Sequence, residues 1–170
     1  AAHADILVTT GGASVGDHDF VLEALKNQGV KIAFWKIAMR PGKPFMYGRR
    51  GHQRVMGLPG NPVSALVCAR LFLKPLLLAL QGLDTTEPPL GARLAEPMRA
   101  NDSRQDYVRA TLAVAEDGAR TVMPFAKQDS SMLATLAHAD CLVVRAPLAP
   151  AAKAGDRVEI VPFPGGTGGV

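Results

Sequence analysis

The feature that most restricts the fold is a change of hydrophobic pattern part-way along the chain. The segment QGLDTTEPPLGA, residues 81–92, combines glycine, a threonine pair and two adjacent prolines, a composition typical of a linker. Before it, apolar runs alternate with a helical pattern, and after it short alternating runs follow one another. We therefore expect two domains, over residues 1–84 and 85–163, followed by a disordered glycine-rich tail over 164–170.

The first half has the pattern of an α/β unit. DILVTT is typical of a buried strand, DFVLEALKNQG of a helix, and VKIAFWKIA of a second strand. PFMYGRRGHQRVMGL predicts a hairpin that turns at residues 48–51. NPVSALVCARLFLKPLLLAL predicts a long helix, with Asn61 as its N-cap and Pro62 in the first turn, where a missing N–H costs nothing.

The second half has the pattern of an all-β domain. YVRATLAV, RTVMPFA, CLVVRAPL and DRVEIVPF predict short strands, and EDGAR and KAGD predict turns between them. SSMLATLAHA is long enough to add a turn of helix. A small barrel or sandwich fits this spacing.

Composition excludes several classes of protein. The 170 residues are 48% hydrophobic and 20% charged, as in a soluble globular protein. No stretch of eighteen apolar residues is free of charge and proline, so we expect no membrane span or membrane partner. Aromatic residues, at 5%, are too sparse for a platform that stacks nucleic-acid bases. Cys68 and Cys141 lack neighbouring metal ligands and are interpreted as reduced core residues.

Charge is unevenly distributed between the halves. The net charge is +4, and residues 1–84 carry ten Lys and Arg against five Asp and Glu. An excess of this kind indicates an anionic ligand for the first half. His3, His18, His52 and His138 show no spacing typical of a metal site.

The loop TTGGASVGDHD follows a strand and precedes a helix, so it lies where open α/β sheets bind ligands. Gly11 and Gly12 let the backbone approach a ligand, Ser14 adds a hydroxyl, and Asp17 and Asp19 offer oxygen ligands suited to Mg²⁺. The alternative is a tight turn with Asp19 as a helix N-cap. The loop matches neither the dinucleotide fingerprint nor the P-loop.

A cationic cluster lies between residues 36 and 54, which contain six cations and no acid. We interpret Lys36 and Arg40, which flank a short apolar stretch, as ligands of a phosphate or oxyanion. The hairpin arginines are interpreted as a solvated surface. The six are Lys36, Arg40, Lys43, Arg49, Arg50 and Arg54.

A third loop, GLPGNPVS, joins a strand end to a helix N-terminus through a proline-rigid turn. The free N–H groups and the dipole of that terminus suit an anion. Ordinary helix capping explains Asn61 and Pro62 equally well, and both interpretations stay open on these residues alone.

The motifs DILVTTGGASVGDHDF, FWKIAMRPGKPFMYG and GLPGNPVSAL, in this order, resemble the molybdopterin molybdenumtransferase (MoeA) family, to which the gephyrin E domain is related. RQDYVRATL, KQDSSMLATLAHADCLVV and AGDRVEI resemble the C-terminal β-domain of that family. The resemblance implies the C-terminal part of a three-layer α/β molybdopterin-binding domain followed by a small all-β, barrel-like domain. It also implies that the chain is about the C-terminal two fifths of such a protein.

The resemblance implies an activity in molybdenum cofactor biosynthesis. Members of the family are cytoplasmic homodimers that insert molybdate into adenylylated molybdopterin and release AMP in a Mg²⁺-dependent step. Other acidic residues of the family are expected upstream of this sequence, so the chain alone is expected to be inactive. A molybdopterin adenylyltransferase-like enzyme and a non-catalytic pterin-binding scaffold are the alternatives, although the former usually has GGTG where this chain has GGAS.

The resemblance also assigns roles to residues. Asp19, Lys36 and Arg40 match catalytic positions, and Asp17 and Asp19 are the expected Mg²⁺ ligands. Two positions depart from the family: Arg40 replaces a common lysine, and Asp129 replaces a common glycine beside Ser130. The expected substrate-binding residues are Gly11, Gly12, Ser14, Gly16, Lys43, Pro59, Gly60, Asn61, Pro62 and Ser130.

Overall fold

The computed structural model describes residues 4–11, 20–129 and 131–164. The chain divides into two compact units. We call Ala1–Ile37 with Pro41–Thr85 the α/β unit, and Ala38–Arg40 with Thr86–Val170 the barrel unit. The chain passes from one unit to the other three times, because residues 38–40 belong to the barrel unit while their neighbours on both sides do not. The expected disordered tail falls mostly on residues 165–170, outside the described part of the chain.

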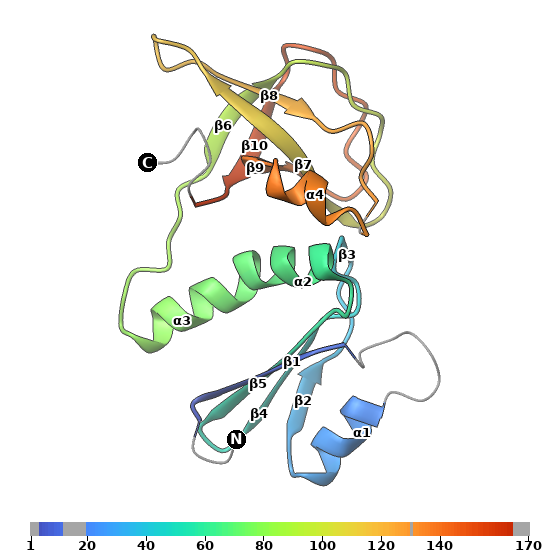
Figure 1. Ribbon diagram of the computed structural model, residues 1–170, viewed down its shortest axis with the longest axis vertical. Coiled ribbons are helices and arrows are strands. Elements are labelled where there is room, and N and C mark those ends of the chain that lie inside the picture. The colour runs from blue at the N-terminus through green and yellow to red at the C-terminus, as the bar shows by residue number, and fades with distance from the viewer. Residues whose placement is uncertain (1–3, 12–19, 130, 165–170) are drawn as a thin grey trace. The chain divides into compact units, whose positions relative to one another are not determined.

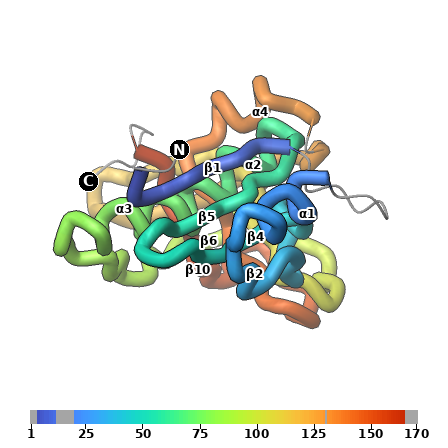
Figure 2. Tube along the Cα trace, turned by 90° about the horizontal axis from the view of Figure 1, so that it is seen from below, coloured from blue at the N-terminus to red at the C-terminus, as the bar shows by residue number. Residues whose placement is uncertain are grey.

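The α/β unit is built around a four-stranded sheet in the order β1-β5-β4-β2, which Figure 2 shows from below. β1 runs parallel to β5, and the two remaining pairs are antiparallel. The elements in chain order are β1 (Ile6–Thr10), α1 (Phe20–Asn27), β2 (Lys31–Phe34), β4 (Met46–Arg50), β5 (Gln53–Leu58), α2 (Pro62–Cys68), a π-helical segment η1 (Ala69–Leu73) and α3 (Lys74–Leu80).

Helices cover both faces of this sheet, with α1 on one side and α2 and α3 on the other (Figure 1). Alternation along the strands produces the two apolar faces, because successive side chains of a strand point to opposite sides. Leu25 of α1 packs in one cluster with Val55 of β5. On the α2 side, Val63 and Val67 are fully buried, and the rings of Phe45 and Phe72 stack at 4.6 Å between centroids. The three layers expected for this half are confirmed.

The hairpin differs in detail from the expectation. Arg50 pairs with Gln53, so the turn consists of Gly51 and His52 rather than residues 48–51. Gly51 has φ +57°, which favours glycine. Gly48 lies inside β4 instead, where a Cβ would meet the Lys31 carbonyl oxygen at 2.9 Å, so the residue serves the close approach of β2.

The predicted long helix is present over Pro62–Leu80, with a π-helical segment in its middle. The Lys74 N–H donates to the Ala69 carbonyl, five residues back, where the chain approaches Pro75. A proline cannot donate within a helix and crowds the preceding turn, which accounts for the local widening. Gly82, at φ +70°, ends the helix in a left-handed cap.

This helix bears on the expectation that the chain has no membrane span. Its 19 residues and mean hydropathy of 1.9 suffice, by length and composition alone, to cross a membrane. Core helices of folded domains pass the same test, and in this chain Val63, Val67 and Cys68 of the helix are fully buried.

The barrel unit contains a closed β-barrel, with strands in the order β7-β8-β6-β10-β9 and a further pairing between β9 and β7. β3 adds to it by pairing in parallel with the start of β7, which places Met39 beside Gln105 and Arg40 beside Asp106. Figure 1 shows the barrel strands wrapping around one another. The elements are β3 (Met39–Arg40), β6 (Leu90–Leu94), β7 (Gln105–Val114), β8 (Arg120–Pro124), α4 (Leu133–Ala137), β9 (Cys141–Arg145) and β10 (Arg157–Pro162).

The interior of the barrel is apolar and includes one of the two cysteines. Val108, Ala110 and Leu112 of β7 point into it together with Val122 and Cys141. The four predicted strands and the short helix are confirmed, whereas β3 and β6 were not predicted. Both cysteines are free and buried, as expected.

Candidate functional site

Two of the predicted ligand-binding loops meet where β1 and β5 end. Because these strands are parallel neighbours, the loops that follow them begin side by side. The Gly11 N–H donates to the Leu58 carbonyl at 3.3 Å, and a Cβ built on Gly60 would lie 3.1 Å from the Gly11 Cα. Gly11 has φ +76°, a conformation that favours glycine. Backbone contact between these two loops therefore requires glycine on both sides.

The turn after β5 leads directly into the long helix. The Asn61 side chain accepts a hydrogen bond from the Ser64 N–H at 3.4 Å, and Pro62 occupies the first turn, as predicted. Pro59 is buried in the turn that precedes them. The hydroxyl oxygen of Thr9, at the end of β1, is buried and has no hydrogen-bond partner in the described part of the chain. The Thr9 hydroxyl could therefore form a hydrogen bond with a polar ligand at this edge of the sheet.

Lys36 and Lys43 lie at the two ends of the excursion that carries β3. The Ile37 N–H donates to the Lys43 carbonyl at 3.0 Å and closes the base of this excursion. Both lysine side chains are exposed, and the Lys36 Nζ lies 3.8 Å from the centroid of the Trp35 ring. Either ammonium group is therefore accessible to an anion.

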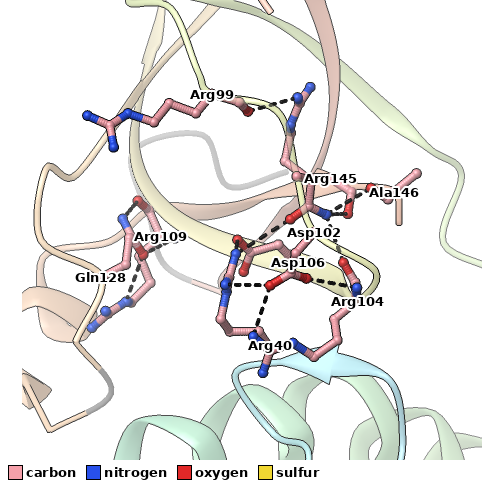
Figure 3. Close-up of polar contacts among 10 residues, drawn as sticks. Arg40, Arg99, Asp102, Arg104, Asp106, Arg109, Gln128, Arg145 and Ala146 are labelled. Atoms are coloured by element: carbon pink, nitrogen blue, oxygen red, sulfur yellow. Dashed lines mark hydrogen bonds and ion pairs between the residues drawn. The ribbon is translucent and has the colours of Figure 1, made fainter. Parts of the chain in front are cut away.

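Arg40 makes its contacts in the barrel unit. Its guanidinium donates to Asp106 at 2.5 Å and to Asp102 at 3.1 Å, as Figure 3 shows. The hydrogen bond to Asp106, followed by the attraction of both carboxylates, raises the pKa of Arg40. The sequence pattern indicates an oxyanion as the ligand of the Arg40 guanidinium, but in the structure this group pairs with the two carboxylates of Asp102 and Asp106. The role of Arg40 in binding substrate stays a prediction.

Arg109 is a candidate that sequence reasoning missed. It is only 1% exposed, although it lies in the middle of β7. Its Nε donates to the Gln128 side chain at 3.3 Å (Figure 3). Its terminal nitrogens donate to the carbonyls of Asp129 at 3.0 Å and Met132 at 3.2 Å. Desolvation lowers the pKa of this guanidinium. The available signal was an arginine within the apolar run YVRATLAV.

The Gln128 side chain completes this arrangement by donating back to the Arg109 carbonyl at 3.0 Å. Asp129 accepts from both the N–H and the hydroxyl of Ser131, each at 2.8 Å, and these bonds lower the pKa of its carboxyl group. Arg109 and Asp129 therefore fix the chain on both sides of residue 130.

Several predicted site residues lie outside the described residues, and their roles stay predictions. In the described ranges, no group of three or more His, Cys, Asp or Glu side chains has a metal-binding arrangement. The expected Mg²⁺ ligands are not among those residues, so the Mg²⁺ site stays a prediction as well. The residues outside the description are Gly12, Ser14, Gly16, Asp17, Asp19 and Ser130.

Comparison with known families accounts for both units. Residues 1–79 match the probable molybdopterin binding domain, and residues 91–163 match the MoeA C-terminal region, domain IV. The two matches occur in the order expected from the motifs and together cover most of the chain. The chain belongs to the MoeA family.

Individual MoeA relatives agree with this assignment. A molybdopterin molybdenumtransferase from Haemophilus influenzae is 35% identical over 164 residues, which are 95% of this chain and 40% of that protein. One from Synechococcus elongatus is 43% identical over 109 residues, covering 63% of this chain and 27% of the relative. The crystal structure of a molybdopterin biosynthesis MoeA protein from Pyrococcus horikosii superposes with a TM-score of 0.74 at 26% identity, over 96% of this chain and 38% of that one. The chain thus spans about two fifths of the length of the Haemophilus influenzae relative and of the Pyrococcus horikosii protein.

Proposed function

We propose that this chain supplies part of the site at which a molybdopterin molybdenumtransferase inserts molybdate into adenylylated molybdopterin and releases AMP. The observation that carries the proposal is the backbone contact between Gly11 and Gly60 at the carboxyl ends of two parallel strands. Family membership supports a pterin as the ligand of these loops. The names of the relatives support the transfer reaction.

Electrostatics explains why such a reaction needs cations at this edge. Molybdate and the phosphoanhydride are both anions, so bringing them together costs free energy unless nearby positive charge compensates. The accessible ammonium groups of Lys36 and Lys43 and the N-terminus of the long helix are suited to this task. The loop N–H groups beyond Gly11 would hold phosphate oxygens.

Magnesium belongs to the same proposal. Asp17 and Asp19 would hold it, and the bound ion would neutralise charge on the phosphoanhydride. Carboxylate oxygens are the ligands that Mg²⁺ prefers, which makes the expected pair chemically suitable. Asp19 would in addition orient the substrate beside the helix that begins at Phe20.

Arg40 and Arg109 are proposed to act through the loops they hold. Arg40 fixes the excursion between Lys36 and Lys43 by binding Asp102 and Asp106. Arg109 fixes the chain on both sides of Ser130, which is proposed to contact the substrate anion. Both arginines are therefore positioning residues in this account. A cytoplasmic homodimer, as in the family resemblance, is the proposed assembly.

A chimera tests the proposal directly. The 170 residues replace the matching part of the Haemophilus influenzae relative, and molybdate-dependent release of AMP from adenylylated molybdopterin is measured. We expect release by the chimera, a loss of at least tenfold in its Lys36→Ala variant, and no release by the 170-residue chain alone. A Lys153→Ala variant is the matched control, because Lys153 is an exposed lysine of the barrel unit. A well-folded chimera that releases no AMP would contradict the proposal.

A further inference from the structure

The barrel unit contains a cavity of about 320 Å³ to which the proposed function assigns no ligand. All of its lining residues belong to the barrel unit, whereas Gly11, Lys36 and Gly60 belong to the α/β unit. The segment between β6 and β7 forms one wall, and Arg145 of β9 and Val108 of β7 form part of another. Mouths of β-barrels are frequent sites for small ligands, and this volume is at the small end of their range.

Arg145 is the residue that points to a ligand. It is 8% exposed, lines the cavity, and carries its charge without an ion pair in the described residues. One terminal nitrogen donates to the carbonyls of Arg99, at 3.3 Å, and Pro150. Figure 3 shows the guanidinium held against the Arg99 carbonyl. The Nε of Arg145 is buried and has no acceptor in the part of the chain that the structure describes.

The nearest carboxylate in the sheet does not serve this donor. Asp106 is the cross-strand partner of Arg145, so the two side chains lie on the same face of the sheet. The Asp106 carboxylate is bound instead to Arg40, at 2.5 Å. Buried donors in folded proteins almost always have an acceptor, and an N–H of a buried guanidinium favours a charged one. The cavity therefore offers a positively charged donor whose acceptor is absent from the described chain.

The charges around the cavity favour an anion. Among the lining residues, the three arginines Arg40, Arg99 and Arg145 stand against two carboxylates, those of Asp106 and Glu96. The Arg99 side chain is exposed and donates to no acceptor in the described ranges. Glu96 is exposed as well. Solvent therefore screens the repulsion between Glu96 and an anion more strongly than it screens the attraction between the buried Arg145 and that anion. The balance is one net positive charge.

The remaining walls are apolar. Met98, Val108 and Phe125 line the cavity beside these arginines. Val108 is 6% exposed and belongs to the barrel core, so this wall is rigid. An inorganic anion alone would leave this apolar surface in contact with water, whereas a ligand with an apolar body would cover it.

We propose that this cavity binds a small organic anion with one phosphate or carboxylate head group and a short apolar body. The head group accepts hydrogen bonds from the guanidinium groups of Arg145 and Arg99, and the body packs against Met98, Val108 and Phe125. No residue of the pterin loops lines this site, although Arg40, a positioning residue in the proposed function, lies in its wall.

The test observes the unpartnered donor itself. In the isotope-labelled 170-residue chain, the arginine side-chain Nε–H resonances are recorded by NMR, and that of Arg145 is assigned by its loss in Arg145→Lys. Phenyl phosphate, benzoate, inorganic phosphate and benzyl alcohol are titrated in turn up to millimolar concentrations. We expect a saturable shift of the Arg145 resonance with phenyl phosphate or benzoate, weaker binding of inorganic phosphate, and none of benzyl alcohol. The stronger of the two organic anions identifies the head group.

Variants separate the site from general charge effects. Binding by the variants is followed through the backbone amide resonances of the cavity wall, because Arg145→Lys lacks the Arg145 side-chain resonance. Arg99→Gln and Arg145→Lys should each weaken binding of the preferred anion about tenfold, as expected for the loss of one charge-assisted hydrogen bond. Arg120→Gln removes the same charge from a barrel strand outside the cavity and should leave binding unchanged. No saturable shift with either organic anion would overturn the proposal. Equal shifts with benzyl alcohol, or equal weakening in Arg120→Gln, would overturn it too.

Discussion

Gly60 approaches Gly11 so closely that a Cβ on Gly60 would lie 3.1 Å from the Gly11 Cα. The obstructing atom is backbone at the end of a sheet strand, which cannot rotate away as a side chain can. The two loops proposed to hold the pterin are therefore fixed relative to each other at their bases, before any ligand arrives.

Substituting Gly60 by alanine should force these loops apart. We expect Gly60→Ala to lower the free energy of unfolding by about 1 kcal/mol or more, as overpacking does, and to weaken pterin binding by the chimera. Gly91→Ala is the control, because a Cβ there meets only the flexible end of Arg157, at 3.4 Å. Urea denaturation and a pterin-binding titration measure both effects. Unchanged stability and unchanged binding in Gly60→Ala would show that the contact is not needed.

Arg40 and Asp106 should be energetically coupled. The side chain of Asp106 is 16% exposed and that of Arg40 is 45% exposed, so solvent screens the pair only in part. We expect a double-mutant cycle with Arg40→Gln and Asp106→Asn to give a coupling of about 1 kcal/mol, the upper end of the range for exposed pairs. Chemical denaturation supplies the four stabilities. Pairing Arg93→Gln with Asp106→Asn is the control and should be additive.

Asp102 should make stability depend on pH in the acid range. Hydrogen bonds from the side chain and N–H of Arg104 lower the pKa of its carboxyl group in the folded state. Because the folded pKa is lowered, the stabilisation is present at neutral pH and is lost as the pH falls through the folded value, below about 4. Denaturation midpoints measured from pH 7 to about pH 3 should therefore fall less steeply in Asp102→Asn. Parallel curves for the two proteins would contradict this assignment.

Removing the Arg109 guanidinium should destabilise the barrel unit. Arg109→Met keeps an apolar stem but leaves the carbonyls of Asp129 and Met132 without their donors. We expect a loss of about 3 kcal/mol, as for hydrogen bonds to a charged group in a buried setting. Arg120→Met, in the neighbouring strand β8, should cost much less. Equal losses of unfolding free energy in the two variants would show that the hydrogen bonds of Arg109 do not stabilise the barrel unit.

The two thiols should resist modification in the folded chain. Burial raises the pKa of Cys68 and of Cys141 to about 12, so very little thiolate exists at pH 8. We expect no reaction with Ellman's reagent in native buffer and two thiols reacting in guanidinium chloride. Because the folded pKa values are raised, stability should also fall as the pH rises above about 9, where the unfolded thiols ionise first. Rapid labelling of either thiol in native buffer would contradict the burial.

Features set by neighbouring residues could be predicted from the sequence. The cap at Asn61 depends on Pro62 and Ser64, which follow it directly. The strands of the barrel were predictable because alternating residues such as Val108, Ala110 and Leu112 must share one face. Family resemblance then identified both units without any long-range contact being known.

Features set by distant residues could not be predicted. β3 has two residues and exists only because Arg40 pairs with β7, more than sixty positions later. The same separation concealed the carboxylates that match the charge of Arg40. Arg109 was overlooked because its partners, such as Gln128, lie in a loop that alternation does not place.

Because residues 38–40 belong to the barrel unit, the two units cannot be separated by a single cut in the chain. A protease acting between α3 and β6 would sever one of the three crossings between the units, yet the barrel would keep a strand that is still covalently part of the other piece. The same holds for recombination between relatives. A barrel moved into another protein as one contiguous segment loses Arg40 from beside Asp102 and Asp106, so a working transplant must be assembled from two segments of the donor.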